Sequence, residues 1–250
     1  MSQKSPMSTQ RVDVVPIRAA GWAALAQALL IFVPTVVLGA AVNWPASLED
    51  PASIALPRLA DNEGAVRLGY FAYLVYSILF AVTIALLARL VEGHLTLGLR
   101  RLIVGFAVAS ALARSIGIVR WLGPMPELAE SYNAAADESQ RYAIASVYDA
   151  LNAYGGTIGE ALGVSLFAAI SIGLLSVGLL RSGDIPRWFA VWSVIAALAL
   201  AAGVTELFGA ALGGLLTVTV TVAQLWFLAG GVWLLVRGRQ WSMSASRNSG

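Results

Sequence analysis

Four long stretches without a charged residue constrain the fold of this chain more than any other feature. They run from Ala19 to Leu48, Leu68 to Ala88, Ala161 to Leu180 and Leu207 to Val236. About 20 apolar residues suffice to cross the hydrocarbon core of a bilayer. Only 12% of the residues are charged, against roughly 25% in soluble domains. The sequence therefore predicts a membrane protein.

Two further stretches are apolar enough to cross a membrane but carry ionisable residues. One, about Leu102 to Leu122, contains Arg114 and Arg120, and the other, Trp188 to Thr205, ends at Glu206. Together with the four uncharged stretches they make six spans. The predicted fold class is all-α: a polytopic membrane protein whose transmembrane domain, residues 19–238, is a six-helix bundle.

The distribution of basic residues predicts the orientation of the bundle. Eleven Lys and Arg residues fall in the two termini and the second and fourth loops, against three in the other loops. Cytoplasmic loops carry such an excess, so both termini should be cytoplasmic and the protein should be a multi-pass protein of the cell membrane. Residues 1–18 do not resemble a signal peptide and are predicted as a cytoplasmic tail. Residues 239–250, rich in serine, are predicted as a disordered cytoplasmic tail.

The loops between the spans differ in their helical potential. The first loop, from Asn43 to Arg67, holds three prolines and should not form one long helix. In the third loop, Glu127 to Tyr142 reads as helical, which predicts an extra extracytoplasmic helical segment before span four. No proline lies between Glu127 and Leu180, so this helix can continue through the membrane.

A resemblance to a known family rests on one turn and the helix before it. The turn reads Leu-Leu-Arg-Ser-Gly-Asp-Ile-Pro-Arg-Trp over residues 179–188, and the preceding helix runs from Gly159 to Leu180. With the six-span layout, this resembles a bacterial domain-of-unknown-function family of integral membrane proteins, over about residues 15–238. The resemblance implies a six-helix fold in a bacterial inner membrane and carries no activity or catalytic residues.

Ionisable and polar residues inside the spans indicate a site, because each charge costs roughly 2.5–3.5 kcal/mol at mid-bilayer unless it is compensated. Asp149, Asn152 and Glu160 share a helix face, and Arg114 lies roughly 20 Å beyond Arg101, at a depth similar to that of Glu160. The predicted ligand-binding pocket lies in the outer leaflet. It is lined by Arg114, Arg120, Asp149, Asn152, Glu160 and Glu206, with Tyr148 and Tyr154 nearby.

Structural interpretations of the same residues stay open at this point. Arg114 and Glu160 could form an ion pair that only holds two helices in register, and Arg120 could extend to the interface beside Trp121. Asp149 could be fully solvated. Small residues at four-residue spacing, Gly155, Gly159 and Gly163, favour close packing inside the bundle over dimerisation. Three polar residues of span six, Thr217, Thr221 and Gln224, suit either hydrogen bonds between helices or a cavity wall.

The inventory of reactive side chains narrows the chemistry. The chain has no cysteine, one histidine, His94, and one lysine, Lys4. This excludes disulfides, thiolate chemistry and haem ligation by two histidines of one chain, and a zinc site would need carboxylates alone. We therefore expect no catalytic residues, no metal site and no cofactor. The basic pI of about 9.1 reflects the cytoplasmic rim and does not predict a nucleic-acid partner.

Three functions fit these observations. The leading hypothesis is a membrane protein that binds a small ligand, lipid or ion in the outer-leaflet pocket, for transport or sensing. An alternative is a non-catalytic scaffold or regulatory subunit that binds a partner membrane protein. An intramembrane lipid-modifying enzyme ranks last, because the chain has so few nucleophiles and metal ligands.

Overall fold

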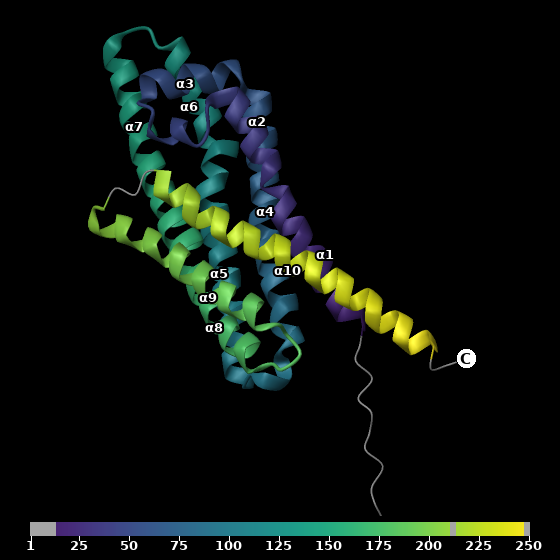
Figure 1. Ribbon diagram of the computed structural model, residues 1–250. Helices are drawn as coiled ribbons and strands as arrows, with labels where there is room; N and C mark the ends of the chain where they lie inside the picture. The colour runs from purple at the N-terminus through teal and green to yellow at the C-terminus, as the bar shows by residue number, and fades with distance from the viewer. Residues whose placement is uncertain (1–13, 211–213, 248–250) are drawn as a thin grey trace, which may run out of the picture.

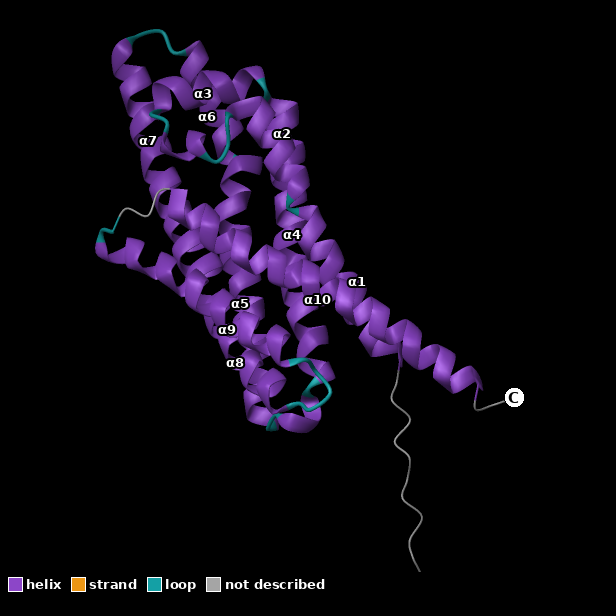
Figure 2. Cartoon of the chain, viewed as in Figure 1, coloured by secondary structure: helices purple, strands orange, loops and turns teal. Residues whose placement is uncertain are grey.

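The protein is a bundle of helices, seen in a computed structural model that describes residues 14–210 and 214–247 (Figure 1). The described residues contain no strand (Figure 2). Six helical segments within them are long and apolar enough to cross a membrane, which confirms the predicted all-α, six-span fold. They are Pro16–Val42, Glu63–Leu90, Leu97–Ala134, Glu138–Arg181, Arg187–Phe208 and Thr217–Gly238.

The first span consists of two helices, α1 (Val14–Leu30) and α2 (Phe32–Val42). Pro34 has no N–H to donate and its ring clashes with the carbonyl four residues earlier, so the helix is interrupted beside Ile31. The second and third spans are long and regular: α4 (Glu63–Leu90) and α5 (Leu97–Leu122), joined by the short helix η2 (Glu92–His94).

A cap of short helices covers the end of the bundle opposite η2 (Figure 1). It consists of η1 (Ala46–Glu49), α3 (Ala52–Asp61) and α6 (Pro124–Ala134). The first loop is therefore mostly helical, although its prolines do break it into pieces. The single helix predicted from Glu127 to Tyr142 is wrong, because α6 ends at Ala134. That the cap lies outside the membrane stays a prediction.

The fourth span is one continuous helix of three parts. These are α7 (Glu138–Gly156), a π-helical segment η3 (Thr157–Phe167) and α8 (Ala168–Arg181). Asp137 begins it by accepting a hydrogen bond from the backbone N–H of Gln140, 2.8 Å away. The absence of proline does allow one uninterrupted helix, as predicted. The π-helical segment was not foreseen; such wide turns are rare and are often found at functional sites.

The last two spans complete the bundle. Helix α9 (Arg187–Ala202) continues into the short helix η4 (Gly203–Phe208), and α10 (Gly214–Arg247) crosses the bundle obliquely and packs on α1 and α9. Helix α10 extends through most of residues 239–250, the segment predicted as a disordered tail. Residues 1–13 of the predicted N-terminal tail and residues 248–250 lie outside the described residues.

Buried apolar side chains form two clusters along the bundle. The larger joins α1, α4, α5, α8, α9 and α10, where Trp226 stacks on Phe189 with ring centroids 5.1 Å apart. The smaller lies beneath the cap and includes Leu56, Met125 and Tyr148. Residues of both clusters line a cavity, so the cavity lies where the two clusters meet.

Candidate ligand-binding cavity

A cavity of about 360 Å³ contains three of the six predicted site residues: Arg114, Arg120 and Glu160. Its size is at the lower end of the range of small-molecule sites, roughly 300–1,000 Å³. The other three predicted residues do not line it. Asp149 is exposed on α7, Asn152 donates a hydrogen bond to the carbonyl oxygen of Leu48, 2.9 Å away, and Glu206 lies in η4.

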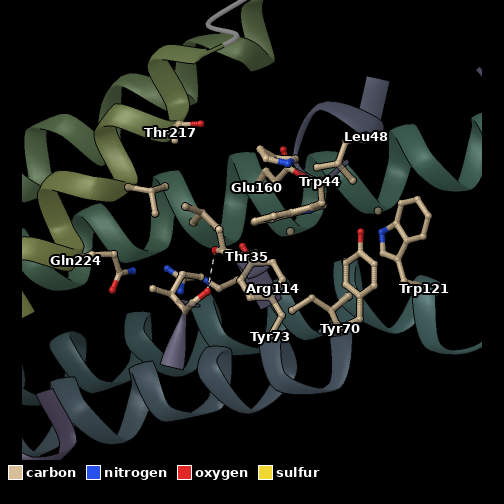
Figure 3. Close-up of a pocket in the computed structure, with 18 of the residues that line it drawn as sticks. Thr35, Trp44, Leu48, Tyr70, Tyr73, Arg114, Trp121, Glu160, Thr217 and Gln224 are labelled. Carbon is tan, nitrogen blue, oxygen red and sulfur yellow. Dashed lines mark hydrogen bonds between the residues drawn. The ribbon is translucent and has the colours of Figure 1, made fainter. Parts of the chain in front are cut away.

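The walls of the cavity come mainly from six parts of the chain. Helix α5 and the π-helical segment supply the charged side, α4 supplies Tyr70 and Tyr73, and the start of the first loop supplies Trp44. Helices α2 and α10 border the remaining side. Figure 3 shows Thr217 and Gln224 on one side of the cavity and Tyr70 and Trp121 on the other. The polar residues of span six therefore do face a cavity.

Arg114 lies near the middle of α5 and is 5% exposed. Its guanidinium carbon is 4.5 Å from the centre of the Phe80 ring, a cation–π contact between α5 and α4. Its Nε atom has no hydrogen-bond partner. A cation–π contact contributes about 2 kcal/mol when desolvated, which does not offset the loss of hydration of a buried charge. Arg114 is therefore incompletely compensated by the described residues.

Arg120 lies close to the cap end of α5 and is 8% exposed. Its guanidinium carbon is 5.4 Å from the centre of the Trp121 ring. Its Nε and Nη1 atoms have no hydrogen-bond partner. Gly155 provides the space for this side chain, because a Cβ there would collide with Nη1 of Arg120. The structural interpretation, in which Arg120 extends to an exposed interface, does not match this burial.

Glu160 projects from the π-helical segment and is half-buried. It lies within electrostatic range of Arg120 and Glu206. The ion pairs among the described residues join Arg58 with Asp50, Arg67 with Glu63 and Arg100 with Glu92, so Glu160 forms none with Arg114. The expected pairing of Arg114 with Glu160 is thus not seen, although both side chains reach the same cavity.

Glycines bring the π-helical segment against α5. Gly117 of α5 lies opposite Gly155 and Gly159, and a Cβ on Gly117 would lie 2.7 Å from the Gly155 carbonyl oxygen. The hydroxyl of Ser110 donates to the carbonyl oxygen of Gly163 at 2.7 Å. The series Gly155, Gly159 and Gly163 therefore packs inside the bundle, as predicted. This close approach positions Glu160 beside the two arginines.

The aromatic part of the wall was missed by sequence reasoning. Tyr70 stacks on Trp121 with ring centroids 5.1 Å apart, and Trp44 contacts Tyr73 edge-on at 5.8 Å. Helix α10 is joined to α4 by a hydrogen bond from the amide nitrogen of Gln224 to the hydroxyl of Tyr76. The available signal was the repeat of tyrosines at three-residue spacing in span two, Tyr70, Tyr73 and Tyr76, which puts polar-tipped rings on one face.

Among the described residues, no three His, Cys, Asp or Glu side chains lie close enough together to hold a metal ion. The polar groups that line the cavity are instead guanidinium, carboxylate, phenol, amide and hydroxyl groups. Two guanidinium groups and one carboxylate give the site an excess of positive charge when all three are ionised. Such a site attracts an anion and offers it several hydrogen-bond donors.

Six apolar helices in a bundle with a buried polar centre define the protein as a polytopic integral membrane protein. The family model described as "Domain of unknown function (DUF4386)" matches residues 19–238. The chain belongs to this family. No curated protein and no solved structure was found to match it. Membership agrees with the resemblance seen in the sequence, over nearly the same residues.

Proposed function

We propose that this protein binds a small ligand with an anionic group in the cavity between α4, α5, the π-helical segment and α10, and that binding serves transport or sensing. One observation carries the proposal. Arg114 and Arg120 are both more than nine-tenths buried, both border the cavity, and neither is ion-paired within the described chain. A bound anion compensates both charges.

The energetics favour a ligand over a purely structural role. A buried ion pair stabilises a fold only when its geometry and its additional hydrogen bonds are good. Here three guanidinium nitrogens have no hydrogen-bond partner: Nε of Arg114 and both Nε and Nη1 of Arg120. Intramembrane ionisable residues that face a cavity mark ligand or ion pathways in general. The unused donors are therefore interpreted as binding groups.

The proposed orientation has both termini in the cytoplasm. The excess of basic residues at the termini and at the second and fourth loops supports it. The cap of η1, α3 and α6 then faces the opposite side, and the cavity beneath it lies in the outer leaflet. A ligand reaches the cavity from the outer side of the membrane.

Ligand-dependent stability tests the proposal. Protein reconstituted in phosphatidylcholine nanodiscs is heated with acetate, inorganic phosphate or dodecanoate, and the unfolding temperature is recorded. A ligand at 100 times its Kd stabilises the folded state by about 2.7 kcal/mol. We expect at least one of the three to raise the unfolding temperature of the wild type and to have little effect on Arg114→Met and Arg120→Met.

The matched control is Arg141→Met, because Arg141 is an exposed arginine of α7 that does not border the cavity. It should respond to ligand as the wild type does. If none of the three anions stabilises the wild type, or if the cavity variants respond as the control does, the proposed function is wrong.

The scaffold alternative loses its main support. It depended on Gly155, Gly159 and Gly163 facing outward for a partner helix. These glycines face α5, where Gly117 and Arg114 occupy the space beside them. No other feature of the described residues favours that alternative over ligand binding.

A further inference from the structure

The cavity has one side that the bundle does not close. Helix α10 packs along α1 and α9, and α2 packs along α4, but α2 and α10 diverge from their common neighbour α1 (Figure 1). Cavity-lining residues on this side are exposed: Phe32 is 60% exposed and Leu225 is 47% exposed. The open side lies between two membrane spans, so it leads sideways into the bilayer.

Charged and uncharged groups occupy different parts of the cavity. Arg114, Arg120 and Glu160 project from α5 and the π-helical segment, on the closed side. The side of α2 and α10 carries no charged residue. Its apolar residues Ile31, Phe32, Val220 and Leu225 lie among the uncharged polar residues Thr35, Thr217, Thr221 and Gln224. A ligand that fits this arrangement has a charged end and an apolar end, and its apolar end points to the lipid.

We infer that the ligand is a single-chain amphiphile with an anionic headgroup, of the fatty acid type. The headgroup lies between Arg114 and Arg120, and the chain extends between α2 and α10 into the bilayer. This inference rests on the proposed function and adds the chemical class of the ligand and its route.

The net charge and the volume of the cavity both favour a ligand with one charged headgroup and one acyl chain. Two guanidinium groups against one carboxylate leave an excess of one positive charge when all are ionised, which matches one headgroup charge. A cavity of about 360 Å³ is small for a drug-sized site, so it accommodates a headgroup with the first part of one chain. Two-chain lipids would need more of the volume beside Trp44 and Tyr73, which aromatic side chains occupy.

The experiment uses bromine quenching of tryptophan fluorescence, because Trp44 and Trp121 border the cavity. The full chain in phosphatidylcholine nanodiscs is titrated with 11,12-dibromooctadecanoate and, separately, with its methyl ester. Both probes enter the bilayer, but only the acid carries a charge. We expect a saturable quenching component for the acid with an apparent affinity at least about tenfold higher than that of the ester.

Variants then test separately the binding of the headgroup and the passage of the acyl chain between α2 and α10. Arg114→Met with Arg120→Met should remove the saturable component. Thr221→Phe, at the cavity lining on α10, should weaken binding of the acid at least tenfold by filling the route. The control Leu198→Phe lies on the exposed face of α9, outside the cavity lining, and should bind as the wild type does.

The outcomes are distinguishable. Equal saturable quenching by acid and ester overturns the inference, because the charge then plays no part; this comparison needs no variant to fold. If acetate competes with the bromo-acid at equal concentration, the acyl chain contributes nothing to the affinity. The amphiphile inference then fails and the proposed anion site stands. If neither probe nor acetate binds, the inference and the proposed function both fail.

Discussion

Two arginines at the cap end of the bundle, Arg58 of α3 and Arg67 of α4, differ from the arginines of the cavity in how they are compensated. Arg58 and Arg67, partly exposed, form ion pairs of 2.7 and 2.6 Å with Asp50 and Glu63. Arg114 and Arg120, both buried, form none. An exposed ion pair contributes little, with a median of about 0–1 kcal/mol, whereas a buried charge without compensation is costly. The buried arginines therefore lack the ion-pair partners that the exposed ones have among the described residues, and the proposed anion would supply that missing charge.

The first prediction concerns the closed wall that holds the buried arginines in place. Gly117→Ala should lower the free energy of unfolding by about 1–3 kcal/mol, because its Cβ would meet the backbone of Gly155 and Gly159. Denaturation by SDS in mixed micelles measures the change. The control Gly105→Ala, on the same helix with open space around it, should stabilise by up to about 1 kcal/mol. Equal effects of the two variants would refute the close contact.

The second prediction concerns the charge excess in the cavity. Glu160→Gln removes the carboxylate, and at an effective dielectric of 20 a charge about 10 Å away acts with about 1.7 kcal/mol. Anion affinity should therefore rise roughly 15- to 20-fold, as measured by the bromo-acid titration. A fall in affinity would mean that Glu160 positions the arginines or binds the ligand directly. The lack of ion pairs at Arg114 and Arg120 would then need another explanation.

The third prediction concerns the hydrogen bond between α5 and the π-helical segment. Ser110→Ala should cost about 1 kcal/mol, because the hydroxyl donates to the Gly163 carbonyl inside the bundle. Ser115→Ala is the matched control, since that hydroxyl bonds only to the Ala111 carbonyl of its own helix and should cost less. Amide hydrogen exchange of residues 157–167 should rise in the first variant alone. Unchanged exchange would show that the π-helical segment does not need this bond.

The smallest effect is expected at the surface. Asp50→Asn breaks the ion pair with Arg58 and should change the free energy of unfolding by about 0.2–1 kcal/mol, less at high salt. SDS denaturation at two ionic strengths measures it. A cost well above 1 kcal/mol would mean that the cap, and not the cavity, contains the energetically important arginine.

The spans could be predicted from the sequence because bilayer thickness sets a length that apolar runs either reach or do not. The residues that line the cavity were predicted less well. Arg114, Arg120 and Glu160 were identified because charges inside spans are costly. Asp149 was included on a 3.6-residue repeat, but the wider π-helical turns begin after Gly156, so residues before and after them do not keep one face.

The partners of the arginines could not be read from the sequence. Equal depth suggested that Arg114 would meet Glu160, but depth does not fix rotation, and Phe80 of the neighbouring helix lies under the guanidinium instead. Tyr70 and Tyr73 were missed because an aromatic residue in an apolar span packs against neighbours as often as it borders a cavity.

An experimental structure with a brominated fatty acid bound tests the central claim most directly. Anomalous scattering locates the bromine atoms, and the density locates the carboxylate. We predict the carboxylate between the guanidinium groups of Arg114 and Arg120, and the bromines between α2 and α10. A cavity without the acid, in which Glu160 forms a direct ion pair with Arg114, would contradict the claim.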